Sequence, residues 1–185
     1  MSRNYKFYNS GGLYFVSFAV VDWIDVFTRN EYKDIIVESL DFCQKNKGLE
    51  LFAWCVMTNH VHLIIRAKEK YVLQDIMRDF KKFTSKEIIN AIRENPQESR
   101  KKWLLEKFIT KDSSRFWGTD NHPIELWSNK VIDQKLDYLH KNPVEEGLVF
   151  HAEHYVYSSA IDYAGEKGIG CYYYELVMKL QTSGV

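Results

Sequence analysis

The chain of 185 residues is long enough for one domain with a sizeable core. Hydrophobic residues make up 45% of it and aromatic residues 15%, which argues against a disordered chain. Lys and Arg together number 25 and so do Asp and Glu, so a nucleic-acid surface has to come from local clustering of cations and not from net charge.

The three cysteines, Cys43, Cys55 and Cys171, lie far apart and form no CxxC pair. This spacing indicates neither a disulfide framework nor a cysteine zinc site. The N-terminal sequence MSRNYKFYNSGG has no long apolar core, and no later segment holds eighteen uninterrupted apolar residues. We therefore expect a cytoplasmic protein without a membrane partner, organised as a single domain over residues 1–185.

The first two predicted elements are a strand and a helix. Residues 13–21 (LYFVSFAVV) are aromatic and β-branched enough to form a buried strand. Thr28 and Glu31 have the spacing of a capping box, which predicts a helix over residues 29–46. Gly48 is placed to end this helix.

A second and a third strand follow, and the third carries two histidines. Residues 49–57 predict a strand, and Thr58-Asn59 can turn the chain into the sequence HVHLII. Successive side chains of a strand point to opposite faces, so His60 and His62 share one face, roughly 6–7 Å apart at the backbone. Imidazole binds several divalent ions, so the pair is a candidate metal or catalytic site. The alternative is that both are ordinary core or surface residues.

A long amphipathic helix is predicted over residues 72–92. Its polar side carries a row of cations at a spacing of four residues, Arg78, Lys82 and Lys86, with Lys81 beside it. On pattern alone, this row is typical of the solvated face of a helix. The same row is also what contact with a phosphate backbone requires, so it is our candidate DNA-binding surface.

Residues 95–125 form a charged insertion, which we expect to leave the main domain, with a short helix around residues 103–108. Near its end, Trp117 and Trp127 flank polar turn residues. Exposed aromatic side chains beside a basic groove can stack on bases, and Trp117 is therefore a DNA-binding candidate. Tryptophans in such a position are more often core anchors, and the sequence leaves both interpretations open.

The last clear helix is predicted over residues 129–142, with Ser128 as its N-cap and Pro143 as its stop. After it, the sequence predicts a short extended piece and a final helix over residues 174–180.

Tyr138 and Asn142 lie four residues apart, so they share one face of the predicted helix. Each has an ordinary structural explanation. Tyr138 is one of twelve tyrosines, and tyrosines in helices usually pack against other elements. An Asn before Pro is a common way to end a helix.

Several of these segments occur together in a known family. NHVHL, a downstream DFKKFTS helix, an FW element, YLHKNPVEEGLV and YSSAIDY follow one another in the chain. This order and spacing resemble the single-tyrosine HUH transposases, most closely the REP-associated tyrosine transposases and their insertion-sequence relatives. The resemblance extends from about residue 14 to residue 163.

The resemblance implies a fold and a set of roles. The fold would be α+β, a ferredoxin-like sandwich with a mostly antiparallel central sheet and helices packed on it. His60, His62 and Asn142 would hold a divalent metal ion, Mg²⁺ or Mn²⁺, and Tyr138 would be the nucleophile. The partner would be single-stranded or hairpin DNA, and a homodimer is possible because relatives include dimers and monomers.

The implied activity is DNA strand transfer through a 5′-phosphotyrosine intermediate. A metal ion on the phosphate would help to overcome the repulsion between the phosphate oxygens and the nucleophile. A tyrosine phenol is almost fully protonated near neutral pH, so it has to lose a proton to react, and the sequence does not identify the base. Two alternatives are a domesticated, non-catalytic protein that binds hairpin DNA, and a hydrolase that uses water as the nucleophile at the same histidines.

Overall fold

The computed structural model describes residues 7–110, 113–119 and 123–169. The strands, helices and short 3₁₀ turns follow one another along the chain in this order: β1 (Tyr14–Ala19), η1 (Val21–Trp23), η2 (Val26–Thr28), α1 (Asn30–Asn46), β2 (Leu49–Val56), β3 (His60–Ala67), α2 (Leu73–Glu94), α3 (Lys101–Phe108), β4 (Ile124–Glu125), α4 (Asn129–Glu145), η3 (Ala152–His154) and α5 (Ala160–Tyr163). No helix among these residues is long and apolar enough to cross a membrane.

The four strands form one sheet in the order β2-β3-β1-β4, and each neighbouring pair is antiparallel. The element order β1-α1-β2-β3-α2-β4 is that of a split β-α-β fold, with α3 added before the last strand. The predicted ferredoxin-like α+β sandwich is therefore confirmed. In the central pair, Ser17 of β1 lies opposite His62 of β3, and Ala19 lies opposite His60.

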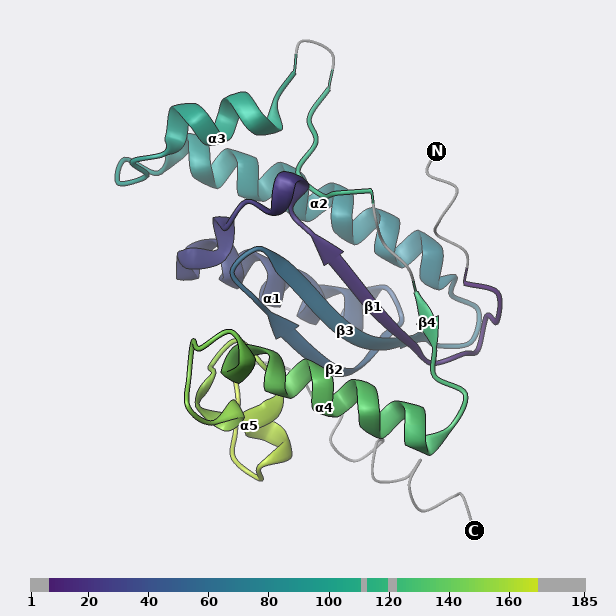
Figure 1. Cartoon of the computed structure of the whole chain (residues 1–185). Coiled ribbons are helices and arrows are strands. Elements are labelled where there is room, and N and C mark those ends of the chain that lie inside the picture. Colours follow the sequence, from purple (N-terminus) through teal and green to yellow (C-terminus); the bar gives the residue numbers. More distant parts are fainter. Residues whose placement is uncertain (1–6, 111–112, 120–122, 170–185) are drawn as a thin grey trace.

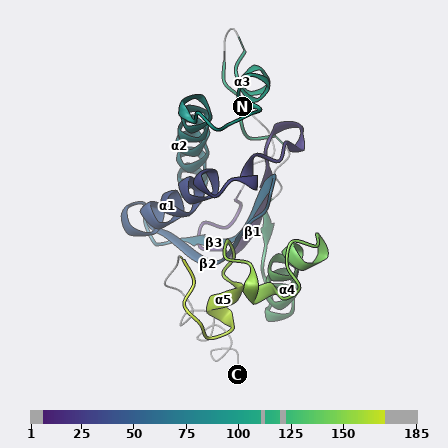
Figure 2. The ribbon, with the colours of Figure 1, turned by 90° about the vertical axis from the view of Figure 1, so that its left-hand side faces the viewer.

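The sheet separates two helical layers. Figure 2 shows α1 and α2 on one face of the sheet and α4 and α5 on the other. Phe18 of β1 points to the first layer, where its ring meets that of Phe80 from α2 at 6.0 Å between centroids. Phe15 of β1 points to the second layer, toward Tyr138 of α4. His62 stacks on Phe15, so the histidine face of β3 is the face that α4 covers (Figure 1).

We expected the charged segment after α2 to leave the main domain. In the structure it is instead part of the core. Four apolar side chains of this segment are buried in the same hydrophobic cluster as the sheet: Leu104, Phe108, Phe116 and Trp117. Burying them removes apolar surface from water and thereby fixes α3 beside α2. The strand β4 then returns to pair with the edge of β1.

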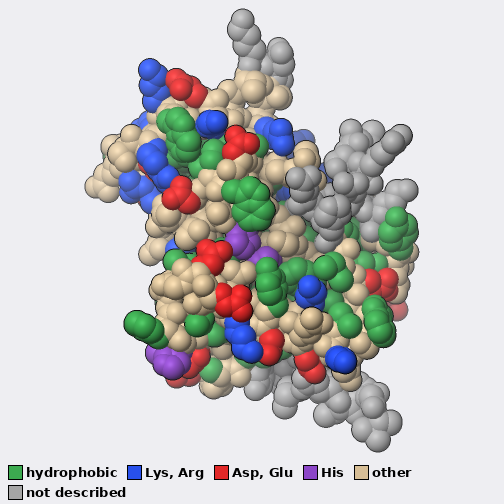
Figure 3. Space-filling model, in the orientation of Figure 1, with side chains coloured by type: hydrophobic (Ala, Val, Ile, Leu, Met, Phe, Trp, Pro, Cys, Tyr) green, Lys and Arg blue, Asp and Glu red, His purple; other side chains and the backbone are tan. Residues whose placement is uncertain are grey.

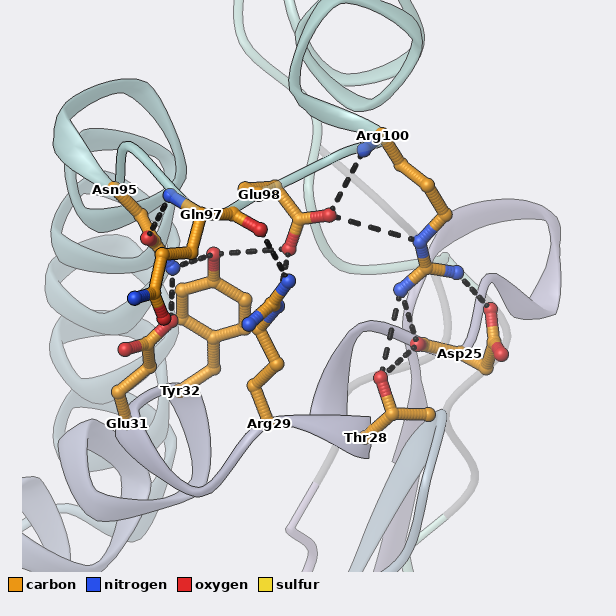
Figure 4. A network of polar contacts seen from close by, with 9 residues as sticks. All are labelled: Asp25, Thr28, Arg29, Glu31, Tyr32, Asn95, Gln97, Glu98 and Arg100. Carbon is orange, nitrogen blue, oxygen red and sulfur yellow. Dashed lines mark hydrogen bonds and ion pairs between the residues drawn. The ribbon is translucent and has the colours of Figure 1, made fainter.

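A buried carboxylate also fixes this segment (Figure 4). Glu98 accepts hydrogen bonds from the Arg29 guanidinium at 2.9 Å, the Tyr32 hydroxyl at 3.1 Å and the Arg100 backbone N–H at 3.0 Å. Burial alone would raise the pKa of Glu98, but these hydrogen bonds and the two guanidinium charges together lower it. The ionised carboxylate therefore connects the start of α1 with the α2–α3 connection.

The predicted capping box at the start of α1 is wrong. The N-cap of α1 is Arg29, and no side chain caps the helix. Thr28 donates its hydroxyl proton to the carbonyl oxygen of Asp25, and Glu31 accepts a hydrogen bond from Asn95. Both side chains therefore bond to groups other than the first backbone N–H groups of α1. The predicted end of α1 is confirmed, because Gly48 follows it with a φ of +70°.

The predicted stop at Pro143 is also wrong, because α4 continues through it to Glu145. A proline near the end of a helix removes one backbone hydrogen bond, and the next N–H groups still find acceptors, as Glu146 N–H does at the carbonyl of Asn142. Asn142 therefore lies inside the helix and is buried. Ser128 caps α4 as predicted. The helix predicted over residues 174–180 lies outside the described residues.

Candidate active site

A cavity of about 320 Å³ opens between β3, the loop after β1 and the C-terminal half of α4. It is lined by Ser17, Trp23, His60, His62, Tyr138, Asn142, Glu145 and Glu146. Figure 3 shows histidine side chains at the surface of the face that α4 covers, with acidic side chains beside them. The cavity brings together the four residues to which the sequence assigned the chemistry, and all four come from one chain.

The two imidazoles face each other across the floor of the cavity. The Nε2 atoms of His60 and His62 are 2.9 Å apart. The other ring nitrogen of His60, Nδ1, lies 2.6 Å from Oδ1 of Asn59. Because an amide oxygen only accepts, Nδ1 of His60 carries the proton and its Nε2 offers a lone pair to the cavity.

Burial keeps both imidazoles neutral. It lowers the pKa of His60 to about 4. Burial, together with smaller effects of His60 and the Lys135 ammonium, lowers the pKa of His62 to about 3. A neutral imidazole is the form that binds a metal ion, so the pair is ready to act as a ligand at neutral pH.

The helix α4 adds a phenol and an amide. Asn142 is 6% exposed, and its amide nitrogen Nδ2 lies 2.9 Å from Nε2 of His62. Tyr138, one turn earlier, is 43% exposed, and its ring centroid lies 5.3 Å from that of His62. The phenol therefore borders both the cavity and solvent.

The donor set fits a divalent ion. Two nitrogens bonded at right angles to one ion at about 2.1 Å lie about 3 Å apart. The Nε2 atoms of His60 and His62 have this spacing, and the Asn142 amide is at the same distance from His62. A rotated amide would present its oxygen in place of its nitrogen. With the amide rotated, the arrangement would have two neutral nitrogen donors and one oxygen donor, all lining the cavity.

Three charged residues of the site were missed by our sequence reasoning. Lys135 lies one turn before Tyr138, with its ammonium 5.6 Å from the centre of the Tyr138 ring. Glu145 and Glu146, two turns after Tyr138, are also lining residues of the cavity. Helical spacing from Tyr138 was the available signal for all three, because residues three, seven and eight apart lie on the same side of a helix.

A strained turn carries Trp23 to the rim of the cavity. Asp22 and Trp23 have φ values of 55° and 54°, in the left-handed region that bulky residues rarely adopt. Such a residue costs about 1–3 kcal/mol and persists only where its surroundings impose it. Here Trp23 is 63% exposed and its ring centroid lies 5.6 Å from that of His60. Our sequence reasoning did not predict this turn.

The chain is similar to known transposases. The model of the family described as "Transposase IS200 like" matches residues 20–115, which is more than half of the chain. The chain belongs to the IS200-like transposase family. The matched segment contains both histidines of β3 and ends before the tyrosine helix α4. No curated protein matches the chain.

Solved structures extend the comparison to the rest of this family member. A REP-associated tyrosine transposase bound to a REP hairpin has 18% sequence identity and a TM-score of 0.64, and the match covers 93% of this chain and 92% of that one. A candidate transposase from Deinococcus radiodurans has 20% identity and a TM-score of 0.44, over 74% of this chain and 94% of that one. The first match shows that the fold, including α4, is that of a tyrosine transposase.

The predicted DNA-binding row of this IS200-like transposase lies away from the cavity. Lys82 and Lys86 are exposed on α2, which packs on the opposite face of the sheet from the histidines. Arg78 is exposed and forms ion pairs with Asp75 and Asp79. Lys81 is half-buried over the rings of Phe18 and Trp117, and burial lowers its pKa to about 8.

Trp117 is a core anchor, which is the second of the two interpretations that the sequence left open. It is 7% exposed, and its indole N–H donates to the hydroxyl of Thr84 at 3.1 Å. Its ring packs edge-to-face on Phe18 and Phe116. In this position neither face of the indole is free to stack on a base.

Proposed function

We propose that the chain is a metal-dependent DNA strand transferase that cleaves and rejoins single-stranded or hairpin DNA through a 5′-phosphotyrosine at Tyr138. One observation carries the proposal. A solvent-accessible phenol, two neutral imidazoles and an amide from elements far apart in the sequence line one cavity. Membership of a transposase family and the likeness to a hairpin-bound tyrosine transposase support DNA as the substrate.

The reaction moves one phosphoryl group twice. The Tyr138 oxygen attacks the phosphorus, the bond from phosphorus to the 3′ oxygen breaks, and that oxygen leaves as a 3′-hydroxyl after taking up a proton. The 5′-phosphate of the downstream strand is then bonded to Tyr138. A 3′-hydroxyl of another strand end attacks the same phosphorus, takes over the bond and returns the phenol. No external energy source is needed, because one phosphoester bond is made for each that is broken.

The chain supplies the charges that this chemistry needs. The Lys135 ammonium lies beside the ring of Tyr138 and attracts the anionic phosphate to it. Glu145 and Glu146 line the cavity, and their carboxylates are candidates to take the phenolic proton of Tyr138. Asn59 holds the His60 ring, so that Nε2 keeps its direction toward the cavity.

His60, His62 and Asn142 would hold the metal ion, with Mg²⁺ or Mn²⁺ proposed from the family. When bound, the ion would withdraw charge from the phosphate oxygens and so ease attack by an anionic nucleophile. Neutral ligands leave the full charge of the ion available for this purpose.

We propose a role for the cationic candidates on α2. Arg78, Lys81, Lys82 and Lys86 would contact the phosphates of a hairpin stem, with Lys82 and Lys86 contributing most because they are exposed and Arg78 is already paired. Trp117 is removed from the DNA-binding set, since its ring is buried. Tyr138, His60, His62 and Asn142 meet within one chain, and the homodimer stays a prediction.

The test is covalent capture of DNA. Labelled hairpins with randomised single-stranded flanks are incubated with the protein and Mn²⁺, and products are separated under denaturing conditions. We expect a labelled protein adduct that EDTA abolishes and that Tyr138→Phe lacks while still binding DNA. The matched control is Tyr8→Phe, which changes a tyrosine that is 85% exposed and outside the cavity, and which should retain the adduct.

Each other outcome has a distinct meaning. An adduct that persists in Tyr138→Phe contradicts the assignment of the nucleophile. Metal-dependent cleavage without an adduct, unchanged in Tyr138→Phe, would make the protein a hydrolase that uses water. Salt-sensitive hairpin binding without any cleavage would make it a non-catalytic binding protein.

A further inference from the structure

The loop after β1 is held rigidly against the turn between β2 and β3. Val20 N–H donates to the carbonyl of Asn59 at 2.8 Å, and Phe27 N–H donates to the carbonyl of Thr58 at 2.8 Å. The side chains of Val21 and Ile24 are buried on either side of Trp23. Since the loop is fixed at both ends, the left-handed turn at Asp22 and Trp23 is imposed by the fold, and it turns the indole outward.

Trp23 is linked to the histidines through one side chain. The amide of Asn59 donates from Nδ2 to the carbonyl of Trp23 at 3.3 Å and accepts with Oδ1 from the ring of His60 at 2.6 Å. The indole meets the imidazole of His60 edge to face, at an interplanar angle of 65°. The position of the exposed ring is thus fixed relative to the residues that would hold the metal ion and, through it, the phosphate.

An exposed indole at this place needs a partner of matching chemistry. A large apolar ring at 63% exposure is costly in water, and a strained backbone at the rim of a cavity suggests a functional reason for it. A nucleobase is a flat aromatic ring separated from its own phosphate by a single sugar. A strand whose phosphate lies at His60 and His62 therefore brings a base within reach of the indole.

We propose that Trp23 stacks on a nucleobase next to the phosphate that Tyr138 attacks, and so seats that phosphate in the cavity. The inference rests on the proposed function for the identity of the ligand, a single DNA strand. Stacking on an aromatic ring accepts any base, so Trp23 contributes affinity and register and does not read the sequence.

The experiment removes the bases instead of the phosphates. Two fluorescent probes are compared in the presence of Mn²⁺: ten thymidine nucleotides, and a chain of the same length in which every nucleotide is abasic. Both probes carry the same phosphates, so the ratio of their dissociation constants reports contacts to the bases. A substitution that weakens phosphate binding in general changes both constants alike and leaves the ratio unchanged. Fluorescence anisotropy gives the two constants for wild type, Trp23→Ala, Trp23→Phe and Trp127→Ala.

We expect wild type to bind the thymidine strand more tightly than the abasic strand. In Trp23→Ala the ratio of the two dissociation constants should fall by roughly 5- to 150-fold. Trp23→Phe keeps a ring and should recover most of it. Trp127→Ala is the matched control and should retain the wild-type ratio. Trp127 is 79% exposed and lies just before the N-terminal end of α4, whereas the cavity is lined by the C-terminal half of that helix. An unchanged ratio in Trp23→Ala, or no binding of the thymidine strand by wild type, would overturn the inference.

Failure here is distinguishable from failure of the proposed function. If the Tyr138 adduct forms but the base preference is the same with and without the indole, only the stacking role of Trp23 is refuted. If the base preference depends on the indole but no adduct forms, only the proposed chemistry is refuted.

Discussion

The buried imidazole pair predicts how stability depends on pH in metal-free protein. Unfolded imidazoles take up a proton near pH 6.5, whereas His60 and His62 stay neutral in the fold down to about pH 4 and about pH 3. Between these pH values the unfolded state binds more protons than the folded state. The contribution of the two neutral imidazoles to the free energy of unfolding is therefore complete above pH 6.5 and is lost as the pH falls. At pH 5 each imidazole accounts for a loss of about 2 kcal/mol relative to neutral pH.

The assay is urea unfolding in EDTA at pH 7 and pH 5, for wild type and for the double variant His60→Gln/His62→Gln. The free energy of unfolding of wild type should fall by about 2–4 kcal/mol more than that of the double variant, because the two rings are in contact and titrate together. A third buried imidazole, His140, has its pKa lowered to about 4 by burial and is present in both proteins, so its contribution cancels. An equal loss in the two proteins would refute the claim that the pair is buried and neutral.

Three further predictions concern the metal site, the DNA surface and the fold. His62→Gln and Asn142→Ala should each weaken Mn²⁺ binding, measured by calorimetry without DNA, by about 10-fold or more, whereas Ser17→Ala, which changes a cavity residue outside the ligand set, should not. Lys82→Ala together with Lys86→Ala should reduce the slope of hairpin affinity against salt by about 2, and an unchanged slope would remove α2 from the DNA surface. Glu98→Ala should lower the free energy of unfolding by about 1–3 kcal/mol, since it leaves the Arg29 guanidinium without its ion-pair partner and the buried Tyr32 hydroxyl without an acceptor. Loss of the exposed pair in Asp137→Ala should cost less than about 1 kcal/mol.

The sequence predicted the parts of the site that depend on local periodicity. Strand alternation places His60 and His62 on one face, and a helix places Tyr138 and Asn142 on one face. Both pairs face the cavity in the structure. That the two faces meet depends on α4 crossing the sheet on the side away from α2, and only the resemblance to transposases pointed to that arrangement.

The remaining features depend on contacts that local sequence does not contain. The turn at Trp23 is imposed by hydrogen bonds to residues far along the chain, such as that from Val21 N–H to the carbonyl of Phe116. Trp117 is buried because α2 supplies the hydroxyl of Thr84 to its indole N–H. Pro143 is tolerated inside α4 because the following N–H groups still find carbonyl partners.

The most direct test of the account is to find which atom of the protein becomes bonded to DNA. The trapped adduct is digested with nuclease and protease, and the modified peptide is sequenced by mass spectrometry. The account predicts a nucleotide joined through its 5′-phosphate to Tyr138 and a free 3′-hydroxyl on the released strand. A nucleotide on another residue, or one joined through a 3′-phosphate, would contradict it.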